Sequence, residues 1–267
     1  MAQIETVALI LDIREYRETS LLLTLLTREH GRLGCIAKGA RRPKSDLAGY
    51  LQSFACLKIR LSVRESGGLA TLITVVQTLH LPDYHQYAAG LERVAYAGLF
   101  AEILNNTEEN DPHSVELFDL AGEFFSGLEK SDTPGSYALA SLYYLLAMLG
   151  YAPDMSARIR PQIHDEGQAG SFSPHRQNAS YSLDIVNGIL STDSSQRNDL
   201  QVKLTGSEVA VLAEILENQQ SKQSFHCITV NRRQGRHLMR LAIRLFEYHL
   251  ERRLKSARFV EEMVLKT

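Results

Sequence analysis

Four cations lie within seven residues in the first fifth of the chain: Lys38, Arg41, Arg42 and Lys44. No acidic residue follows them until Asp46. Like charges crowded on one short loop repel each other, so the cluster suggests an anionic partner. Lys and Arg donate charge-assisted hydrogen bonds to anionic groups such as phosphates. The alternative is an ordinary solvated surface loop.

Two further groups of cations could extend such a surface. The first comprises Arg14, Arg17 and Arg32, which lie on or beside the strands expected before the loop. The second lies near the C-terminus, where Arg236 and Arg240 are four residues apart and share one face of an expected helix. We expect the first group to be secondary phosphate contacts. The helix could extend the DNA track or be an ordinary amphipathic helix with solvated arginines.

The charge of the chain is unevenly distributed, although the total is only −2. Residues 1–80 hold 11 Lys and Arg against 7 Asp and Glu, and residues 231–267 hold 10 against 4. Residues 81–230 hold 8 against 20. Basic ends can attract a polyanion, and an acidic middle limits nonspecific binding.

Motifs for catalysis or cofactor binding are missing from the sequence. It contains no phosphate-binding GxxxxGK[ST] loop, no GxGxxG after a strand, no HExxH and no GxSxG. Its three cysteines form no CxxC pair and are too few for a four-cysteine zinc site. We therefore expect a protein that is not an enzyme and that has no metal or cofactor.

The first 80 residues read as a β domain. Runs of alternating or β-branched residues are separated by polar or glycine-bearing turns, which predicts short strands. The five expected strands are Ile4–Ile13, Ser20–Leu26, Arg32–Lys38, Phe54–Val63 and Leu69–Leu79. Closure into a small barrel would remove the exposed edges. A five-stranded oligonucleotide-binding (OB) barrel is the expected fold, and an SH3-like barrel is the structural rival.

Residues 81–267 read as a helical domain, because the apolar period changes to about 3.6 after Pro82. A nearly all-apolar helix is expected over Tyr137–Leu149, with Gly150 as its C-cap. Residues 151–202 are expected to be an irregular insertion. Thr205 or Ser207 should cap the next helix, and one long final helix is expected from about Gln234 to Met263.

Several stretches resemble the bacterial RecO family of recombination mediators. The most specific is AKGARRPKS at residues 37–45, preceded by LLTREHG at residues 25–31. The others are LQSF at 51–54, LGYAPD at 149–154 and FEYHLERRLKS at 246–256. These stretches are spread over nearly the whole chain and occur in the family's order.

The resemblance implies an N-terminal OB barrel, a helical C-terminal domain and a role without catalysis. It further implies binding of single- and double-stranded DNA, annealing of complementary strands, and work with RecR, RecF and the C-terminal tail of single-strand binding protein (SSB). Many members carry paired cysteines after the LGYAP segment, whereas this chain has Ala157 and Arg160 there. We therefore expect a degenerate zinc-ribbon-like insertion without zinc.

Two functional hypotheses remain open, together with a minor third. In the first, the protein is a DNA-annealing mediator whose basic loop grips phosphates. In the second, it is an adaptor for the SSB tail and RecR with incidental DNA affinity, for which Arg93, Arg158 and Arg160 are the available cations. A metal-dependent nuclease is the minor rival. We expect a monomer that is cytoplasmic and nucleoid-associated, since the N-terminus reads as a strand and not as a signal peptide.

Overall fold

The structure is a computed structural model of the chain. It describes residues 2–64, 67–83, 87, 90–107, 113–155, 180–191, 200–217 and 230–265. The chain divides into two compact units, one formed by Met1–Pro134 with Leu254–Thr267 and the other by Gly135–Arg253. None of the helices in the described ranges is both long and apolar enough to cross a bilayer.

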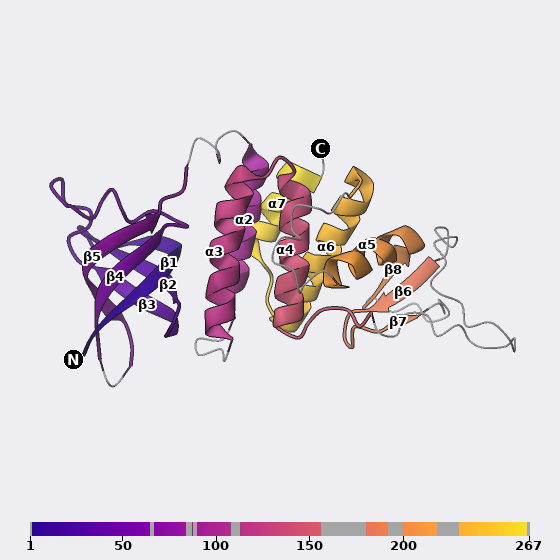
Figure 1. Cartoon of the computed structure of the whole chain (residues 1–267), viewed down its shortest axis with the longest axis horizontal. Coiled ribbons are helices and arrows are strands. Elements are labelled where there is room, and N and C mark those ends of the chain that lie inside the picture. Colours follow the sequence, from indigo (N-terminus) through magenta and orange to yellow (C-terminus); the bar gives the residue numbers. More distant parts are fainter. Residues whose placement is uncertain are drawn as a thin grey trace, which may run out of the picture. The chain divides into compact units, whose positions relative to one another are not determined.

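The first unit begins with a closed five-stranded barrel (Figure 1). Its strands are β1 (Ala2–Tyr16), β2 (Ser20–Thr27), β3 (Gly31–Ala37), β4 (Cys56–Val63) and β5 (Ala70–His80), in the spatial order β1-β2-β3-β5-β4. These strands match the five expected runs, and the OB barrel is confirmed over its SH3-like rival. The barrel interior holds alternate apolar residues of each strand, such as Leu23 and Leu25 of β2 or Leu57, Ile59 and Leu61 of β4.

Long strand β1 organises the barrel, because it pairs with β2 along its second half and with β4 along its first half. A register shift between Ile10 and Asp12 lets the strand bend from one partner to the other. Strands β3 and β5 close the barrel through a short parallel pairing at Cys35–Ala70 and Ile36–Thr71. Along the rest of its length, β5 pairs with β4.

Two helices pack on the barrel, α2 (Leu91–Asn105) and α3 (Ser114–Lys130), and both contact the β1–β3 side. Phe54 joins the barrel to α3. Its backbone has a φ of +71°, which is costly for a residue with a side chain, and its ring stacks on Phe125 at 4.7 Å between ring centres. The barrel and these helices form one compact unit, and the end of β5 at His80 coincides with residue 80, where the boundary was predicted.

The second unit contains α4 (Pro134–Met148), α5 (Gly206–Glu217) and α6 (Arg232–His249). Helix α4 is buried along most of its length, as expected, and Gly150 ends it with a φ of +77°. The hydroxyl of Tyr143, which is fully buried, donates to the carbonyl of Leu238 at 3.0 Å and so ties α4 to α6. Burial raises the pKa of Tyr143 well above its ordinary value, with a smaller contribution from Glu208.

Thr205 is the cap of α5. The amide of Glu208 donates to the Thr205 hydroxyl at 3.3 Å, and the Thr205 amide donates to the Glu208 carboxylate at 2.8 Å. This reciprocal pair satisfies two backbone donors at the helix start. Of the two expected caps, the structure therefore selects Thr205.

The expectation of an irregular segment over 151–202 is wrong for part of it. A three-stranded sheet of order β7-β6-β8 is formed by β6 (Ser180–Asp184), β7 (Leu190–Ser191) and β8 (Gln201–Thr205). Each run is too short to show a clear alternation, so its strand character depends on pairing with its neighbours in the sheet. Ala157 and Arg160, where zinc ligands were expected to be replaced, lie outside the described residues.

The expectation of one helix from Gln234 to Met263 is also wrong. Helix α6 ends at His249, Glu251 takes a φ of +50°, and a new helix α7 (Lys255–Val260) continues into a π-helical turn, η4 (Glu261–Leu265). Glu102 of α2 makes the restart possible, because its carboxylate accepts the backbone amides of Lys255 at 2.9 Å and Ser256 at 2.7 Å. Those first-turn amides have no partner within their own helix.

Candidate nucleic-acid interface

The basic loop lies at the end of the barrel where β1 turns into β2. The amide of Arg41 donates to the carbonyl of Thr19 in that turn at 2.9 Å, and Ala40 is buried beneath the loop. Gly39 has a φ of +70°, and a Cβ there would lie 3.4 Å from the Arg42 side chain. Glycine therefore allows the tight turn that holds Arg42 close to the loop backbone.

Three of the loop cations are exposed and unpaired. The side chains of Lys38, Arg42 and Lys44 make no ion pair or hydrogen bond within the described ranges. Bringing three like charges together without a neutralising partner leaves a local positive potential. This arrangement can bind phosphates without first breaking an internal contact.

Arg41 differs from its neighbours because it already has a carboxylate partner. Its Nη2 lies 2.8 Å from Glu15 Oε1, and its Nη1 donates to the carbonyl of Glu18 at 3.4 Å. The pair is exposed on the Glu15 side, so its attraction is weakened by solvent. A phosphate would have to compete with Glu15 for this guanidinium.

Arg14 and Arg17 lie at the same end of the barrel as the loop. Arg14 is paired with Asp12 at 2.6 Å, although its side chain remains 74% exposed. Arg17 has a φ of +53° and places its guanidinium 5.3 Å from the centre of the Tyr16 ring, within cation–π range. The structure therefore brings six of the seven barrel candidates to one end.

Arg32 is the exception, because it lies near the β2–β3 turn at the opposite end of the barrel. It is paired with Leu26 in the ladder, and its Nη2 donates to the carbonyl of Thr107 at 2.9 Å. Nearby Arg28 binds Asp119 of α3 at 3.1 and 3.2 Å through two nitrogens. Hydrogen bonding to Asp119 raises the pKa of Arg28 above its ordinary value.

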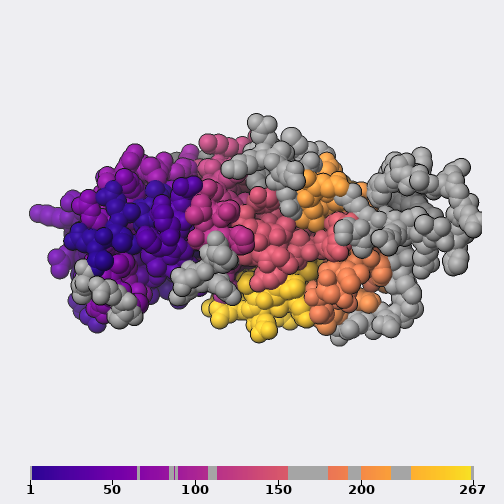
Figure 2. Space-filling model, turned by 60° about the horizontal axis from the view of Figure 1, so that its bottom comes forward, coloured from indigo at the N-terminus to yellow at the C-terminus, as the bar shows by residue number. Residues whose placement is uncertain are grey.

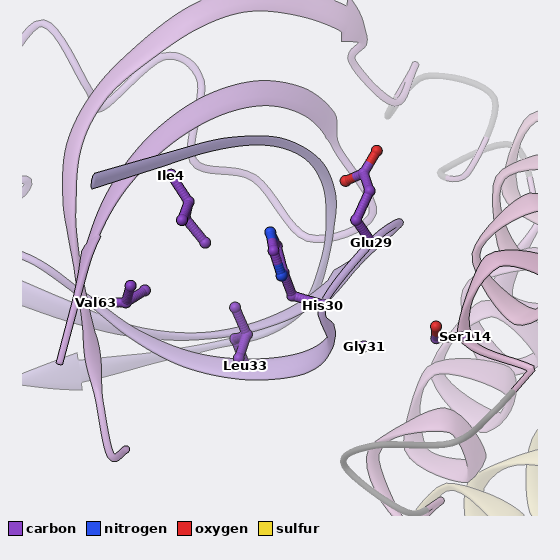
Figure 3. Close-up of a pocket in the computed structure, with 7 residues that line it drawn as sticks. All are labelled: Ile4, Glu29, His30, Gly31, Leu33, Val63 and Ser114. Carbon is purple, nitrogen blue, oxygen red and sulfur yellow. The ribbon is translucent and has the colours of Figure 1, made fainter. Parts of the chain in front are cut away.

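That opposite end also carries a pocket of about 540 Å³ (Figure 3). Ile4, Leu33 and Val63 supply its apolar lining, and His30 points between them in the close-up. The carboxylate of Glu29, which also lines the pocket, accepts the hydroxyl of Thr6. The lining combines apolar side chains with Glu29, His30 and Ser114, and the Glu29 carboxylate would repel a phosphate, so we do not include this pocket in the candidate interface.

The α6 cations belong to the second compact unit. Arg240 and Arg244 are exposed, while Leu238, Leu241 and Leu245 bury the opposite side of the helix. Arg236 is half-buried, and its Nε and Nη2 are enclosed without a hydrogen-bond partner. The helix is therefore amphipathic, and the contact of Arg236 and Arg240 with DNA stays a prediction.

Aromatic side chains contribute little to the loop end. Tyr50 is 41% exposed beside the loop, Tyr16 is half-buried against Arg17, and Phe54 is occupied by Phe125 of α3. Stacking of bases on aromatic rings would therefore be limited to two tyrosines.

Sequence reasoning missed two groups of charged partners. It did not find Glu15, because nothing in the sequence links it to Arg41 before the β1–β2 turn is placed beside the loop. It also passed over Lys58 and Arg60 of β4, which both bind Glu5 at 2.9 Å. Their spacing of two in an expected strand was a signal that they share one face.

The described residues offer no candidate catalytic centre. They contain no group of three or more His, Cys, Asp or Glu that could hold a metal ion. Burial raises the pKa of the Cys35 thiol to about 12 and that of Cys56 to about 11, so both thiols stay protonated and weakly nucleophilic near neutral pH. The fold and its basic loop instead suit a nucleic-acid-binding protein of the OB class.

Comparison with known proteins agrees with that class. Residues 1–81 match the family model described as "Recombination protein O N terminal", and residues 89–258 match "Recombination protein O C terminal". The chain belongs to the RecO family.

Curated relatives carry the name "DNA repair protein RecO". The chain is 30% identical to the one from Bacillus subtilis over 61% of each protein. It is 37% identical to the one from Chromobacterium violaceum over 55% of this chain and 57% of the relative. These two matches thus span about six tenths of the relatives' length. The match to Synechococcus elongatus, at 29% identity, spans 97% of this chain and 95% of the relative.

Proposed function

We propose that this protein is a non-catalytic DNA-binding mediator of recombinational repair. The observation that supports this most directly is the trio of exposed, unpaired cations Lys38, Arg42 and Lys44 at one end of an OB barrel. Membership of the RecO family supplies the repair context. We expect a mediator of this kind to act at the nucleoid in the cytoplasm.

The loop binds the phosphate backbone and reads no bases. Lysine and arginine displace counterions from the DNA, which contributes affinity without sequence information. Arg41, Arg14 and Arg17 lie at the same barrel end and add to the positive potential there, despite their partners. Single- and double-stranded DNA should both bind, because both present phosphates.

Annealing of complementary strands follows from the same surface. Two single strands repel each other through their phosphates, and a basic surface reduces that repulsion. No covalent bond is made or broken in this step. The family context adds SSB-coated strands as the substrate and RecR, with RecF, as partners in loading the recombinase.

The salt dependence of binding tests the loop directly. In the triple variant Lys38→Ala, Arg42→Ala and Lys44→Ala, the slope of log K against log[salt] for single-stranded DNA should flatten by roughly 2 units, at about 0.7 per lost contact. A control variant, Lys130→Ala with Lys203→Ala, removes two other exposed cations and should change the slope little. An unchanged slope in the triple variant would refute the assignment of the loop.

Strand annealing tests the activity itself. Complementary oligonucleotides coated with SSB should anneal faster with the wild-type protein than without it, and the triple variant should lose most of this acceleration. If the wild-type protein did not accelerate annealing, the proposed mediator function would be refuted even if the protein bound DNA. Clean cleavage of DNA by the protein in the presence of Mg²⁺ or Mn²⁺ would instead support the hypothesis that it is a metal-dependent nuclease.

The adaptor alternative loses one of its cations to intramolecular contacts. Arg93 donates to the carbonyl of Leu128 at 3.3 Å and to that of Ser131 at 2.8 Å, so it binds the C-terminal end of α3. Arg158 and Arg160 lie outside the described residues. Titration of a labelled SSB tail peptide against the full chain tests this role, and a lack of saturable binding would argue against it.

A further inference from the structure

Strand β5 carries three irregularities that all have the same result. In its pairing with β4, Leu61 faces Leu72 but Arg60 faces Thr74, so Ile73 has no opposite residue. The same skip occurs twice more along the strand, and it leaves Val76 and then Leu79 without an opposite residue. These are β-bulges, each of which inserts one extra residue into the strand.

The bulges decide which side chains of β5 face the barrel interior. Leu72 and Val75 belong to the barrel core although they are three residues apart, which strict alternation would not allow. The extra residues are aliphatic and exposed: Ile73 at 43%, Val76 at 44% and Leu79 at 47%. We call these three residues the β5 ridge.

Most of the ridge lies away from α2 and α3, although the last residue of β5 reaches α3: His80 Nε2 lies 3.3 Å from Glu129 Oε1. The two helices pack mainly on β1, β2 and β3, and in Figure 1 most of β5 lies on the other side of the barrel. On the face seen in Figure 2, the barrel is coloured indigo and purple, and α3, in magenta, adjoins it on one side only. Two more exposed leucines, Leu69 and Leu81, flank the ridge in sequence. Grouped exposed aliphatic residues of this kind mark interaction surfaces, whereas single ones need no explanation.

Charges beside the ridge define the chemistry of its partner. Described residues 56–64 and 67–80 contain Lys58, Arg60 and Arg64 and no carboxylate. The Glu5 carboxylate of β1 is shared between Lys58 and Arg60, which lowers its pKa, so this cluster keeps a net positive charge. A complementary partner therefore combines aliphatic side chains with acidic ones.

We infer that the β5 ridge is a docking surface for an acidic, aliphatic-rich segment of a partner protein. Aliphatic side chains of the segment cover Ile73, Val76 and Leu79, and its carboxylates lie beside Lys58 and Arg60. The three bulges interrupt the regular edge of β5, so recognition depends on side chains more than on addition of a β-strand. This surface is formed by other residues than the basic loop, and the inference does not depend on the proposed DNA function.

The test uses the full chain and synthetic probes. The probes are fluorescein-labelled 12-residue peptides in which Leu and Ile alternate with Asp and Glu, with matched peptides that carry Lys instead. The ridge variant is Ile73→Thr with Val76→Thr and Leu79→Thr, since threonine preserves strand propensity. Leu91→Gln with Val94→Gln on α2 is the control, because these residues are exposed at 57% and 42%.

Acidic peptides should bind the wild type saturably, as measured by fluorescence anisotropy. The ridge variant should bind them about tenfold more weakly or worse, because three aliphatic contacts are lost. Lys58→Gln with Arg60→Gln should lower the affinity for the acidic peptides roughly threefold, and the α2 control variant should leave that affinity unchanged. Lysine peptides should not distinguish the wild type from the ridge variant. DNA affinity should remain unchanged in the ridge variant.

Three results would overturn the inference. The first is equal binding of acidic peptides to the wild type and the ridge variant, or no saturable binding at all. The second is a wild-type dimer in sedimentation velocity that the ridge variant abolishes, which would assign the ridge to a second copy of the chain. The third is ridge-dependent binding to anionic lipid vesicles. If the ridge variant loses cooperative thermal unfolding, two other variants replace it in the same assay. They are Val76→Thr alone and Lys58→Gln with Arg60→Gln.

Discussion

The two ends of the barrel use cations in opposite ways. At the β2–β3 end, Arg28 and Arg32 bind Asp119 and the carbonyl of Thr107, so both hold the helical layer against the barrel. At the β1–β2 end, Lys38, Arg42 and Lys44 have no partner within the described part of the chain. Similar residue types therefore stabilise the fold at one end and remain available for a ligand at the other.

This difference separates structural cations from binding cations more clearly than exposure does. Arg28 and Arg41 are both partly exposed, at 46% and 35%, yet Arg28 is held through two nitrogens by a residue of another element. A bidentate guanidinium–carboxylate pair is geometrically specific, so its loss affects the fold before it affects a ligand. Substitutions at the two ends should therefore change different measured quantities.

The largest expected effect is on DNA affinity at the loop end. Lys38→Ala with Arg42→Ala and Lys44→Ala should weaken binding to single-stranded DNA by roughly a hundredfold at low salt, since three phosphate contacts are lost. The free energy of unfolding should stay within about 0.5 kcal/mol of wild type, because these exposed side chains make no ion pair or hydrogen bond with the described residues. Fluorescence anisotropy and denaturant unfolding measure the two quantities. A large loss of stability would mean that the loop is structural.

At the opposite end, Arg32→Ala should mainly lower stability. Loss of its hydrogen bond to the buried Thr107 should reduce the free energy of unfolding by about 1–2 kcal/mol. DNA affinity should change less than about twofold, because that guanidinium is held away from the loop. If Arg32→Ala weakened DNA binding as much as a loop substitution, the distinction between the two ends would be lost.

Glu102 extends the comparison to an acidic residue that serves the fold. Burial opposes ionisation of its carboxylate, but hydrogen bonds from Ser256 and Lys255 outweigh burial, so its pKa lies below the ordinary value of 4.5. A depressed pKa means that the stabilisation is present at neutral pH and is lost as the pH falls below about 4.5.

Glu102→Gln should therefore cost about 1 kcal/mol at pH 7 and less at pH 3, because glutamine keeps one acceptor but loses the charge at the start of α7. Urea unfolding at the two pH values measures the difference. Equal costs at both pH values would show that the charge of Glu102 is unimportant for the restart of the chain at α7.

The smallest expected effect concerns Arg41, which is intermediate between the two ends. Glu15→Gln removes the carboxylate that pairs with it at 2.8 Å. DNA affinity should rise about two- to threefold, since an exposed ion pair is weak and a phosphate no longer competes with it. The rise should disappear in the background of Arg41→Ala. A fall in affinity would indicate that Glu15 positions Arg41 for the DNA.

Local patterns were sufficient where the structure depends on neighbours in sequence. The period-two runs identified all five barrel strands, and the apolar run over Tyr137–Leu149 identified α4 with its Gly150 cap. The same kind of reasoning failed at residues 250–254. Helix α6 stops there and α7 begins under a cap from Glu102, which is 153 residues away from Lys255 in the chain. A helical period cannot reveal a cap supplied by another element.

The sequence by itself determined the barrel strands, helix α4 and the position of a basic loop, because alternation, helical period and charge are local properties. Tertiary structure alone decided which cations remain available. Arg41 meets Glu15, and Arg32 meets Thr107 over a separation of 75 residues, only after strand order and register have formed. The bulges that expose Ile73, Val76 and Leu79 likewise arise from the pairing of β5 with β4. Pairings of this kind depend on which strands become neighbours, and that is a property of the whole barrel.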